Sequence, residues 1–185
     1  MACDLIKGYT VACRDGIGGV KSLFFGQFDE ITLSTGTGAV TDVEMGSAAL
    51  HKYTPKRGVA SISESVTASS ENGTVFYTHT CNLKFNKLSA EYQNELRLIA
   101  QNRLIVFAEL NEQTAGGKNI VMCLGATNGL ELSAATNTSG VAFGDLNGYD
   151  WTFEGISSEP MLEVDDYTTV AMDNSAFTKG TTVTA

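Results

Sequence analysis

The chain has 185 residues and a formal net charge of −9, and 43% of its residues are hydrophobic and 9% aromatic. This length suits one domain, and the composition excludes the low hydrophobicity and high charge of a disordered chain. No stretch approaches the roughly 18 apolar residues of a membrane span, and the N-terminus lacks a secretory pattern. We therefore expect a protein made in the cytosol, with no membrane segment.

The first apolar run covers residues 20–33. Nineteen glycines against two prolines, with serine and threonine between short apolar runs, favour strands over helical bundles. The run follows a glycine-rich turn, and Gly26 within it predicts a β-bulge. Residues 34–45 are small and polar, so we expect a flexible surface connection there.

Residues 59–85 predict the clearest hairpin. Polar and apolar side chains alternate on both sides of a turn at residues 71–73. Glu64 is the exception on the apolar face of the first strand. His79 falls on the apolar face of the second strand, so we interpret it as a core or interface histidine rather than a catalytic one.

One helix is predicted at residues 89–102. Ser89 suits the N-cap and Glu91 the first turn, and one face is apolar at helical spacing, with Tyr92, Leu96, Ile99 and Ala100. The next two segments, residues 103–110 and 118–125, are strongly apolar and predict core strands joined by a glycine-bearing turn.

The last third of the chain predicts two more strands and an arm. Residues 129–135 suit a short strand, and residues 147–156 place Tyr149, Trp151 and Phe153 on one face. From Pro160 onward the sequence is acidic and then threonine-rich, with no clear period.

These elements predict the domain organisation. We expect a single β domain over residues 1–162, with its helix near residues 89–102. Residues 163–185 would form an acidic and then threonine-rich C-terminal arm. Its composition allows ordering on a partner.

Acidic residues are distributed unevenly along the chain. Between Lys118 and Lys179 there is no Lys or Arg, but this segment holds Glu131, Asp145, Asp150, Glu154, Glu159, Glu163, Asp165, Asp166 and Asp173. Such a surface repels phosphate backbones, so specific binding of nucleic acid through it is disfavoured. It is either a solvated face that favours solubility or a surface past which a polyanion moves without adhering.

The sequence carries no recognisable catalytic, cofactor or metal-binding motif. The glycine run at residues 16–22 lacks phosphate-loop spacing, and Asp165 and Asp166 would point to opposite faces of a strand. His51 is expected on the surface. We expect reduced, structural cysteines at Cys3, Cys13, Cys81 and Cys123, with a metal site as the weaker alternative. The prediction is a protein that is not an enzyme and needs no cofactor.

Three stretches, in this order, have counterparts in a known family. They are the N-terminal CDLIKGYTVACRDGIGGVKSLFF, the helix SAEYQNELRLIAQN, and the late GVAFGDLNGYDWTFEGISSEPM. Over residues 2–162 the chain resembles the tail tube proteins of tailed bacteriophages, and with them the inner-tube proteins of contractile injection machines. The last stretch resembles the region where tube proteins place a Gly-Asp-x-Asn-Gly turn before an apolar strand.

The resemblance implies a mainly β fold, a β-sandwich or partly closed barrel of antiparallel strands flanked by one helix, with extended terminal arms. It implies rings of six copies that stack into the hollow tail tube of a virion, assembled in the host cytoplasm. Partners would be further copies of the chain and other phage tail proteins. DNA would pass through the lumen without specific binding.

Candidate surfaces follow from this resemblance and from the charge pattern. Candidates for an acidic lumen or surface are Glu131, Asp145, Asp150, Glu154, Glu163, Asp165 and Asp166. Candidates for contacts between rings lie in the polar connection after the first apolar run, at Thr35, Thr37, Val40 and Asp42.

Two other classes of protein fit the same strands. A monomeric immunoglobulin-like binding module would need a concave or aromatic recognition patch. Another virion component, such as a tail terminator or head-decoration protein, would close a single ring or cap. Concentration-dependent polymerisation separates the tube protein from the binding module, and a filament rather than a single ring separates it from the other virion components.

Overall fold

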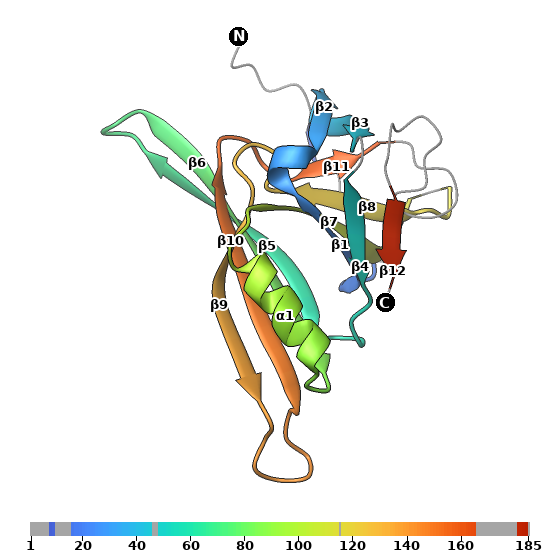
Figure 1. Ribbon diagram of the computed structural model, residues 1–185. Coiled ribbons are helices and arrows are strands. Elements are labelled where there is room, and N and C mark those ends of the chain that lie inside the picture. The colour runs from blue at the N-terminus through green and yellow to red at the C-terminus, as the bar shows by residue number, and fades with distance from the viewer. Residues whose placement is uncertain (1–7, 10–15, 46–47, 115, 166–180, 185) are drawn as a thin grey trace.

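The computed structural model describes residues 8–9, 16–45, 48–114, 116–165 and 181–184 (Figure 1). This part of the chain forms twelve strands, one short 3-10 helix at Phe28–Glu30 and one α-helix, α1, at Ala90–Ile99. The strands are β1 Val20–Gln27, β2 Thr32–Gly36, β3 Ala39–Glu44, β4 Ala49–Tyr53, β5 Ala60–Ser69, β6 Thr74–Asn86, β7 Leu104–Gln113, β8 Asn119–Leu124, β9 Glu131–Thr138, β10 Gly148–Ser157, β11 Leu162–Val164 and β12 Thr181–Thr184.

The strands form two sheets, and the predicted β-sandwich with one helix is confirmed. The larger sheet has the order β12-β4-β1-β7-β8-β11-β3-β2, and the smaller one the order β5-β6-β10-β9. Neither sheet closes into a barrel, because the two end strands of each are not paired with each other in the described chain. Figure 1 shows α1 lying against the smaller sheet.

The central strands of the larger sheet are buried on both faces. On β1, Leu23 and Phe25 face the core between the two sheets, which we call the inter-sheet core. Phe24 faces a second core, which includes Val40 and Val43 of β3. A strand covered on both sides is apolar throughout rather than alternating. This explains the continuous apolar runs that predicted β7 and β8.

Aromatic side chains dominate the inter-sheet core. Tyr149, Trp151 and Phe153 of β10 are each 0% exposed, as their alternation predicted. The ring of Phe85 lies perpendicular to that of Trp151 at 4.6 Å between centroids. The hydroxyl of Tyr149 donates to the Ser89 carbonyl at 3.0 Å, so β10 also positions the start of α1.

The helix begins as predicted and is shorter than predicted. Ser89 is the N-cap, and its hydroxyl accepts a hydrogen bond from the Tyr92 backbone N–H at 3.3 Å. Tyr92, Leu96 and Ile99 pack against the inter-sheet core. Ala100, predicted on the apolar face, is exposed and caps the end of the helix.

The predicted bulge at Gly26 is wrong. Gly26 pairs in register with Ile105, and the extra residue in β1 is Lys21. The glycine is needed for packing instead, because a Cβ there would lie 2.2 Å from Cδ1 of Ile31. At this position, glycine within a strand marks the close approach of a neighbouring side chain.

Residues 34–45 form most of a hairpin, not a flexible connection. β2 and β3 pair antiparallel and are joined by Thr37 and Gly38, whose φ angles are +46° and +83°. Two residues with positive φ fit the twist of a hairpin. Val40 and Val43 are buried in the second core and hold β3 in place. The sequence analysis did not identify these two valines as core residues, because the residues around them are small and polar.

The C-terminal segment adds strands to the larger sheet. β11 pairs with β8 and with β3, and Leu162 and Val164 are buried, so the predicted domain boundary at residue 162 cuts through a strand. β12 pairs in parallel with β4. β11 and β12 of the predicted arm are therefore sheet, because β8 and β3 flank β11 on both sides and β4 pairs with β12 on one side.

Candidate assembly surfaces

The smaller sheet has two open edges. Within the described residues, β5 pairs only with β6, and β9 pairs only with β10. All three pairings in this sheet are antiparallel, so β5 and β9 run in opposite directions. Each edge presents backbone N–H and C=O groups to which a strand of another chain can add.

The outward face of this sheet is polar over most of its length, and Ile156, which is 57% exposed, continues it at one end. We call it the polar face, and it consists of Ser61, Ser63, Thr80, Asn82, Lys84, Asp150, Thr152 and Glu154, which are cross-strand neighbours. The hydroxyl of Thr152 donates to Oδ1 of Asn82 at 2.9 Å. Lys84 Nζ lies 2.7 Å from Asp150 Oδ2, so the lysine is neutralised by a carboxylate beside it. The sheet thus has one aromatic face in the core and one hydroxyl-rich face toward solvent.

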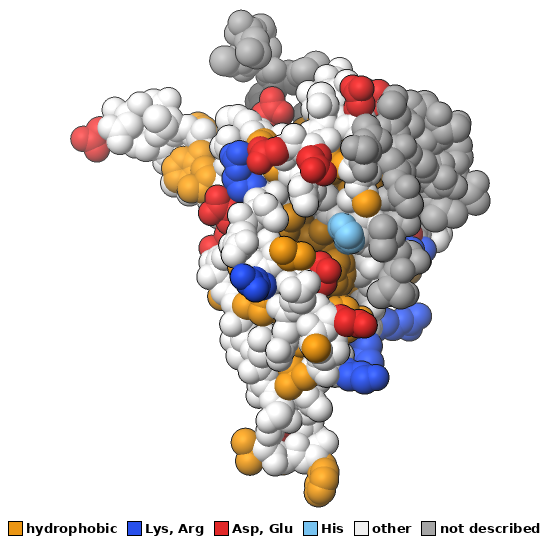
Figure 2. Space-filling view, viewed as in Figure 1, with side chains coloured by type: hydrophobic (Ala, Val, Ile, Leu, Met, Phe, Trp, Pro, Cys, Tyr) orange, Lys and Arg blue, Asp and Glu red, His pale blue; other side chains and the backbone are white. Residues whose placement is uncertain are grey.

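The predicted acidic surface is divided among three places: the polar face, the other sheet, and the loop between β9 and β10, which carries Asp145. Asp150 and Glu154 lie on the polar face, and Glu131 is the direct cross-strand neighbour of Glu154. Glu163 and Asp165 belong to the other sheet, at and after β11. Figure 2 accordingly shows acidic side chains scattered over the visible face rather than gathered. Asp166 lies outside the described residues.

The candidate contacts of the β2–β3 hairpin differ in exposure. Thr35 and Thr37 are exposed, and Asp42 is half-buried. Val40 is 0% exposed and belongs to the second core, so its assignment to a contact between rings is wrong. Val40 and Val43 are three residues apart and both reach the second core, because a β-bulge at Thr41 interrupts the alternation of β3.

Two hairpins reach beyond the sandwich and expose apolar side chains (Figure 1). On the β5–β6 hairpin, Val66 and Val75 are 58% and 55% exposed. On the loop between β9 and β10, Val141 and Phe143 are fully exposed. Sequence reasoning missed both tips. The available signal was length, because β5 and β6 have 10 and 13 residues, more than the usual 5–6.

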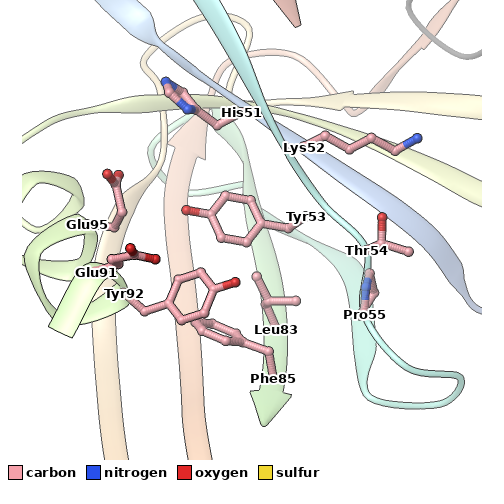
Figure 3. Close-up of a pocket in the computed structure, with 10 residues that line it drawn as sticks. All are labelled: His51, Lys52, Tyr53, Thr54, Pro55, Leu83, Phe85, Glu91, Tyr92 and Glu95. Carbon is pink, nitrogen blue, oxygen red and sulfur yellow. The ribbon is translucent and has the colours of Figure 1, made fainter. Parts of the chain in front are cut away.

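A pocket of about 560 Å³ opens between α1, β4 and β6 (Figure 3). Its wall and floor include Tyr53, Leu83, Phe85 and Tyr92, and Glu91 and Glu95 of the helix lie at its side. The Tyr53 hydroxyl points toward the helix. Burial, together with the nearby Glu95 carboxylate, raises the pKa of Tyr53 to about 12, so this hydroxyl stays protonated at neutral pH.

A buried carboxylate fixes the start of β1. Glu109 is 5% exposed and accepts hydrogen bonds from Lys21 Nζ at 2.8 Å, from Asn119 Nδ2 at 2.7 Å, and from the hydroxyl of Ser22. Because of the bulge at Lys21, the side chains of two consecutive residues, Lys21 and Ser22, both reach this carboxylate. Burial alone would raise the pKa of Glu109, but the three hydrogen bonds outweigh it and the pKa lies below its ordinary value. Because Ser22 is only 2% exposed, this cluster joins strands rather than offering a nucleophile to solvent.

Replacing Glu109 by glutamine is expected to lower the free energy of unfolding at pH 7 by about 1–3 kcal/mol, the range for hydrogen bonds to a charged group. A carboxyl with a lowered pKa in the fold stabilises it fully above the unfolded pKa, near 4.5, and loses that contribution as pH falls through the folded pKa. The difference between wild type and Glu109→Gln should therefore shrink below pH 4.5. Urea unfolding followed by fluorescence of Trp151, the single tryptophan, measures it, and a constant difference down to pH 3 would contradict it.

His79 is a core histidine, as its position in the alternation predicted. It is 1% exposed, and its Nδ1 accepts the Gly125 backbone N–H at 3.2 Å. Its Nε2 lies 3.2 Å from Glu64 Oε2, at an angle outside hydrogen-bond geometry. Burial lowers the pKa of His79, and Glu64 offsets this only partly. The polar Glu64 on an apolar face is explained by this pairing and by the Met161 backbone N–H that it accepts.

The remaining predictions about chemistry concern thiols, metals and membranes. Cys81 and Cys123 are buried thiols without a disulfide, and burial raises their pKa values. Cys3 and Cys13 lie outside the described residues. Among the described residues, no three His, Cys, Asp or Glu side chains converge as metal ligands, and no helix has the length and apolar character to cross a membrane.

Comparison of the chain with models of protein families, with curated proteins and with solved structures finds no match. The sequence pattern and the surfaces described above are therefore the features that bear on the function of the protein.

Proposed function

We propose that this protein is a structural subunit that assembles with copies of itself into rings, and that the rings stack into the hollow tail tube of a bacteriophage. The observation that carries the proposal is the smaller sheet, with two open edges of opposite direction and a polar outer face. The resemblance of three stretches of the sequence to tail tube proteins agrees with this arrangement.

The open edges suit closure into a ring. Because β5 and β9 run in opposite directions, β9 of one copy can add antiparallel to β5 of the next, and the alternation continues without a break. Repeating this heterologous contact gives a closed ring when the rotation closes. Six copies would supply about 24 strands, and at ~4.8 Å per strand the barrel would be roughly 37 Å across before tilt widened it. Such a barrel can surround a DNA duplex.

The polar face suits the inside of that barrel. The aromatic face of the sheet is already covered by the larger sheet, so only the polar face can line a lumen. It carries hydroxyl and amide groups, one lysine neutralised by Asp150, and the carboxylates of Glu154 and Glu131 beside it. A surface without unpaired cations offers no counterion-releasing contacts to phosphates. DNA would therefore pass without adhering.

Negative-stain electron microscopy of the purified protein over a range of concentrations tests the proposal. We expect rings or stacked tubes with a central channel, because edge pairing is concentration-dependent. Sedimentation of the same samples measures the assembled fraction. A protein that stays monomeric at every concentration and salt condition would overturn self-assembly. It would favour a monomeric binding module, for which the aromatic pocket beside α1 would be the recognition site.

A further inference from the structure

The loop between β9 and β10 presents two apolar side chains on a braced turn. Val141 and Phe143 are fully exposed, and Figure 2 shows hydrophobic side chains at the projecting tip at the bottom of the view. The Asp145 carboxylate accepts the backbone N–H of Val141 at 2.9 Å and that of Ala142 at 2.7 Å. Gly140 has φ +70°, and a Cβ there would lie 2.7 Å from Cβ of Asp145. The turn is therefore held in one shape, although its apolar side chains contact nothing in their own chain.

The loop leads away from the rest of its own molecule (Figure 1). Its base is tied to the start of the helix region by a hydrogen bond from the Lys87 N–H to the Asn147 carbonyl, 2.7 Å long. From there the loop extends beyond the N-terminal end of α1, away from the two sheets (Figure 1). Burying the exposed valine and phenylalanine would gain hydrophobic free energy. The partner that buries them must come from another molecule.

The same chain carries a cavity of matching chemistry. The pocket between α1, β4 and β6 has a volume of about 560 Å³, within the range of pockets that enclose a ligand. Its floor is formed by the side chain of Leu83 and the rings of Phe85 and Tyr92. The side chain of Lys52 points away from these rings, and its ammonium lies over the ring of Phe24, 5.3 Å from its centre. The floor of the pocket therefore consists of apolar and aromatic groups, which suit the uncharged, apolar tip of the loop between β9 and β10.

We propose that Val141 and Phe143 of one copy insert into the pocket beside α1 of a copy in the next ring. A projection and a pocket at different places on one chain give a head-to-tail contact, which repeats from ring to ring. Strands of a barrel run at about 35–45° to its axis, so the loop between β9 and β10 would project from one rim of a ring. The contact rests on the proposed function and names the residues that would join successive rings.

Cysteine cross-linking tests the contact directly. The double variant Phe143→Cys/Glu95→Cys should form disulfide-linked multimers in assembled tubes after mild oxidation, because position 95 lies at the side of the pocket. Each single variant is the control, since it retains every native cysteine and lacks one partner. Multimers in the double variant alone support the contact. Tubes without any such cross-link overturn it and leave the proposed tube intact, whereas a wild-type protein that never assembles overturns both.

Replacing the apolar side chains of the tip by polar ones tests how much they contribute to the stacking of rings. Val141→Ser/Phe143→Ser should raise the protein concentration needed for tubes by tenfold or more and leave the unfolding temperature unchanged, because both side chains are exposed in the monomer. The control is Val66→Ser/Val75→Ser, which removes two exposed apolar side chains, 58% and 55% exposed, from the other hairpin. Rings that form but no longer stack support the contact between rings. Equal stacking by the tip variant and wild type overturns it.

Discussion

Replacing Gly148 by alanine is expected to lower the free energy of unfolding by about 3 kcal/mol, in the upper part of the range for single substitutions. A Cβ at this position would lie 2.1 Å from the carbonyl oxygen of Phe85 and 2.8 Å from Cα of Asn86. Both are backbone atoms of β6, so no side chain can rotate to make room. The first pairings of β10 with β6 and β9 begin at this glycine, and the strain would spread to Tyr149. Thermal unfolding should show a fall in Tm of roughly 6–12 °C for a chain of this size.

Gly144 provides the matched control four residues earlier. A Cβ there meets no atom within 4 Å, and its φ is not positive, so Gly144→Ala should change the free energy of unfolding by less than about 0.5 kcal/mol. If Gly148→Ala and Gly144→Ala unfold at the same temperature, then β10 does not approach β6 as closely as the structure indicates. Gly148 is also the second glycine of the Gly-Asp-x-Asn-Gly turn in the stretch that resembles tube proteins, so close strand pairing accounts for the glycine at this position.

The sequence predicted most strongly those elements whose pattern depends on one nearby surface. The alternation in residues 59–85 and the aromatic face of β10 were read correctly, because period-2 burial follows directly from a sheet with one covered face. Ser89 was identified as the N-cap because capping involves only residues of the first turn. The apolar runs of β7 and β8 were predicted as core strands, although only the structure shows that two different cores lie on their two faces.

The parts that were missed depend on residues far apart in the chain. Glu109 is the one acid in the apolar run of residues 103–110, and its role follows only when Lys21, 88 positions away, meets it at a bulge. Val40 was placed on the surface because its neighbours are small and polar, yet β11 brings the far end of the chain beside it. The acids of the last third were treated as one surface because they are adjacent in sequence. The two sheets separate them in space, and no local pattern records which sheet a strand joins.

The exposed tips were missed for a related reason. Alternation tells which face of a strand is apolar, but not how far the opposite sheet extends to cover it. Val66 continues the buried face of β5, with Val75 on the paired strand, after the larger sheet has ended. The sequence pattern alone does not show that this continuation of the apolar face is left uncovered.

A proline at a position of β9 whose backbone N–H points to the open edge of the sheet is expected to prevent ring formation without unfolding the monomer. Ala135 and Thr136 are consecutive, exposed and in regular register with β10, opposite Trp151 and Asp150. In an edge strand the N–H groups of successive residues point in opposite directions, so one of the two donates to β10 and the other points to the open edge. Of the variants Ala135→Pro and Thr136→Pro, one should lose a bond within the sheet and the other only the outward N–H. The second should unfold at a temperature close to that of wild type.

The assembly of that stable variant is the decisive measurement. Each closed ring uses the β9 edge of every copy. The variant loses one backbone hydrogen bond between copies, worth about 0.5–1.5 kcal/mol, and places a pyrrolidine ring where the neighbouring strand must approach. We therefore expect the protein concentration needed for assembly to rise about tenfold or more. Thermal unfolding selects the variant, and sedimentation with electron microscopy measures rings. The other proline variant controls for general loss of stability, because it should melt at a lower temperature. Rings that form as readily from the stable variant as from wild type would show that copies do not join through β9, and the edge of β5 would then lose its proposed partner as well.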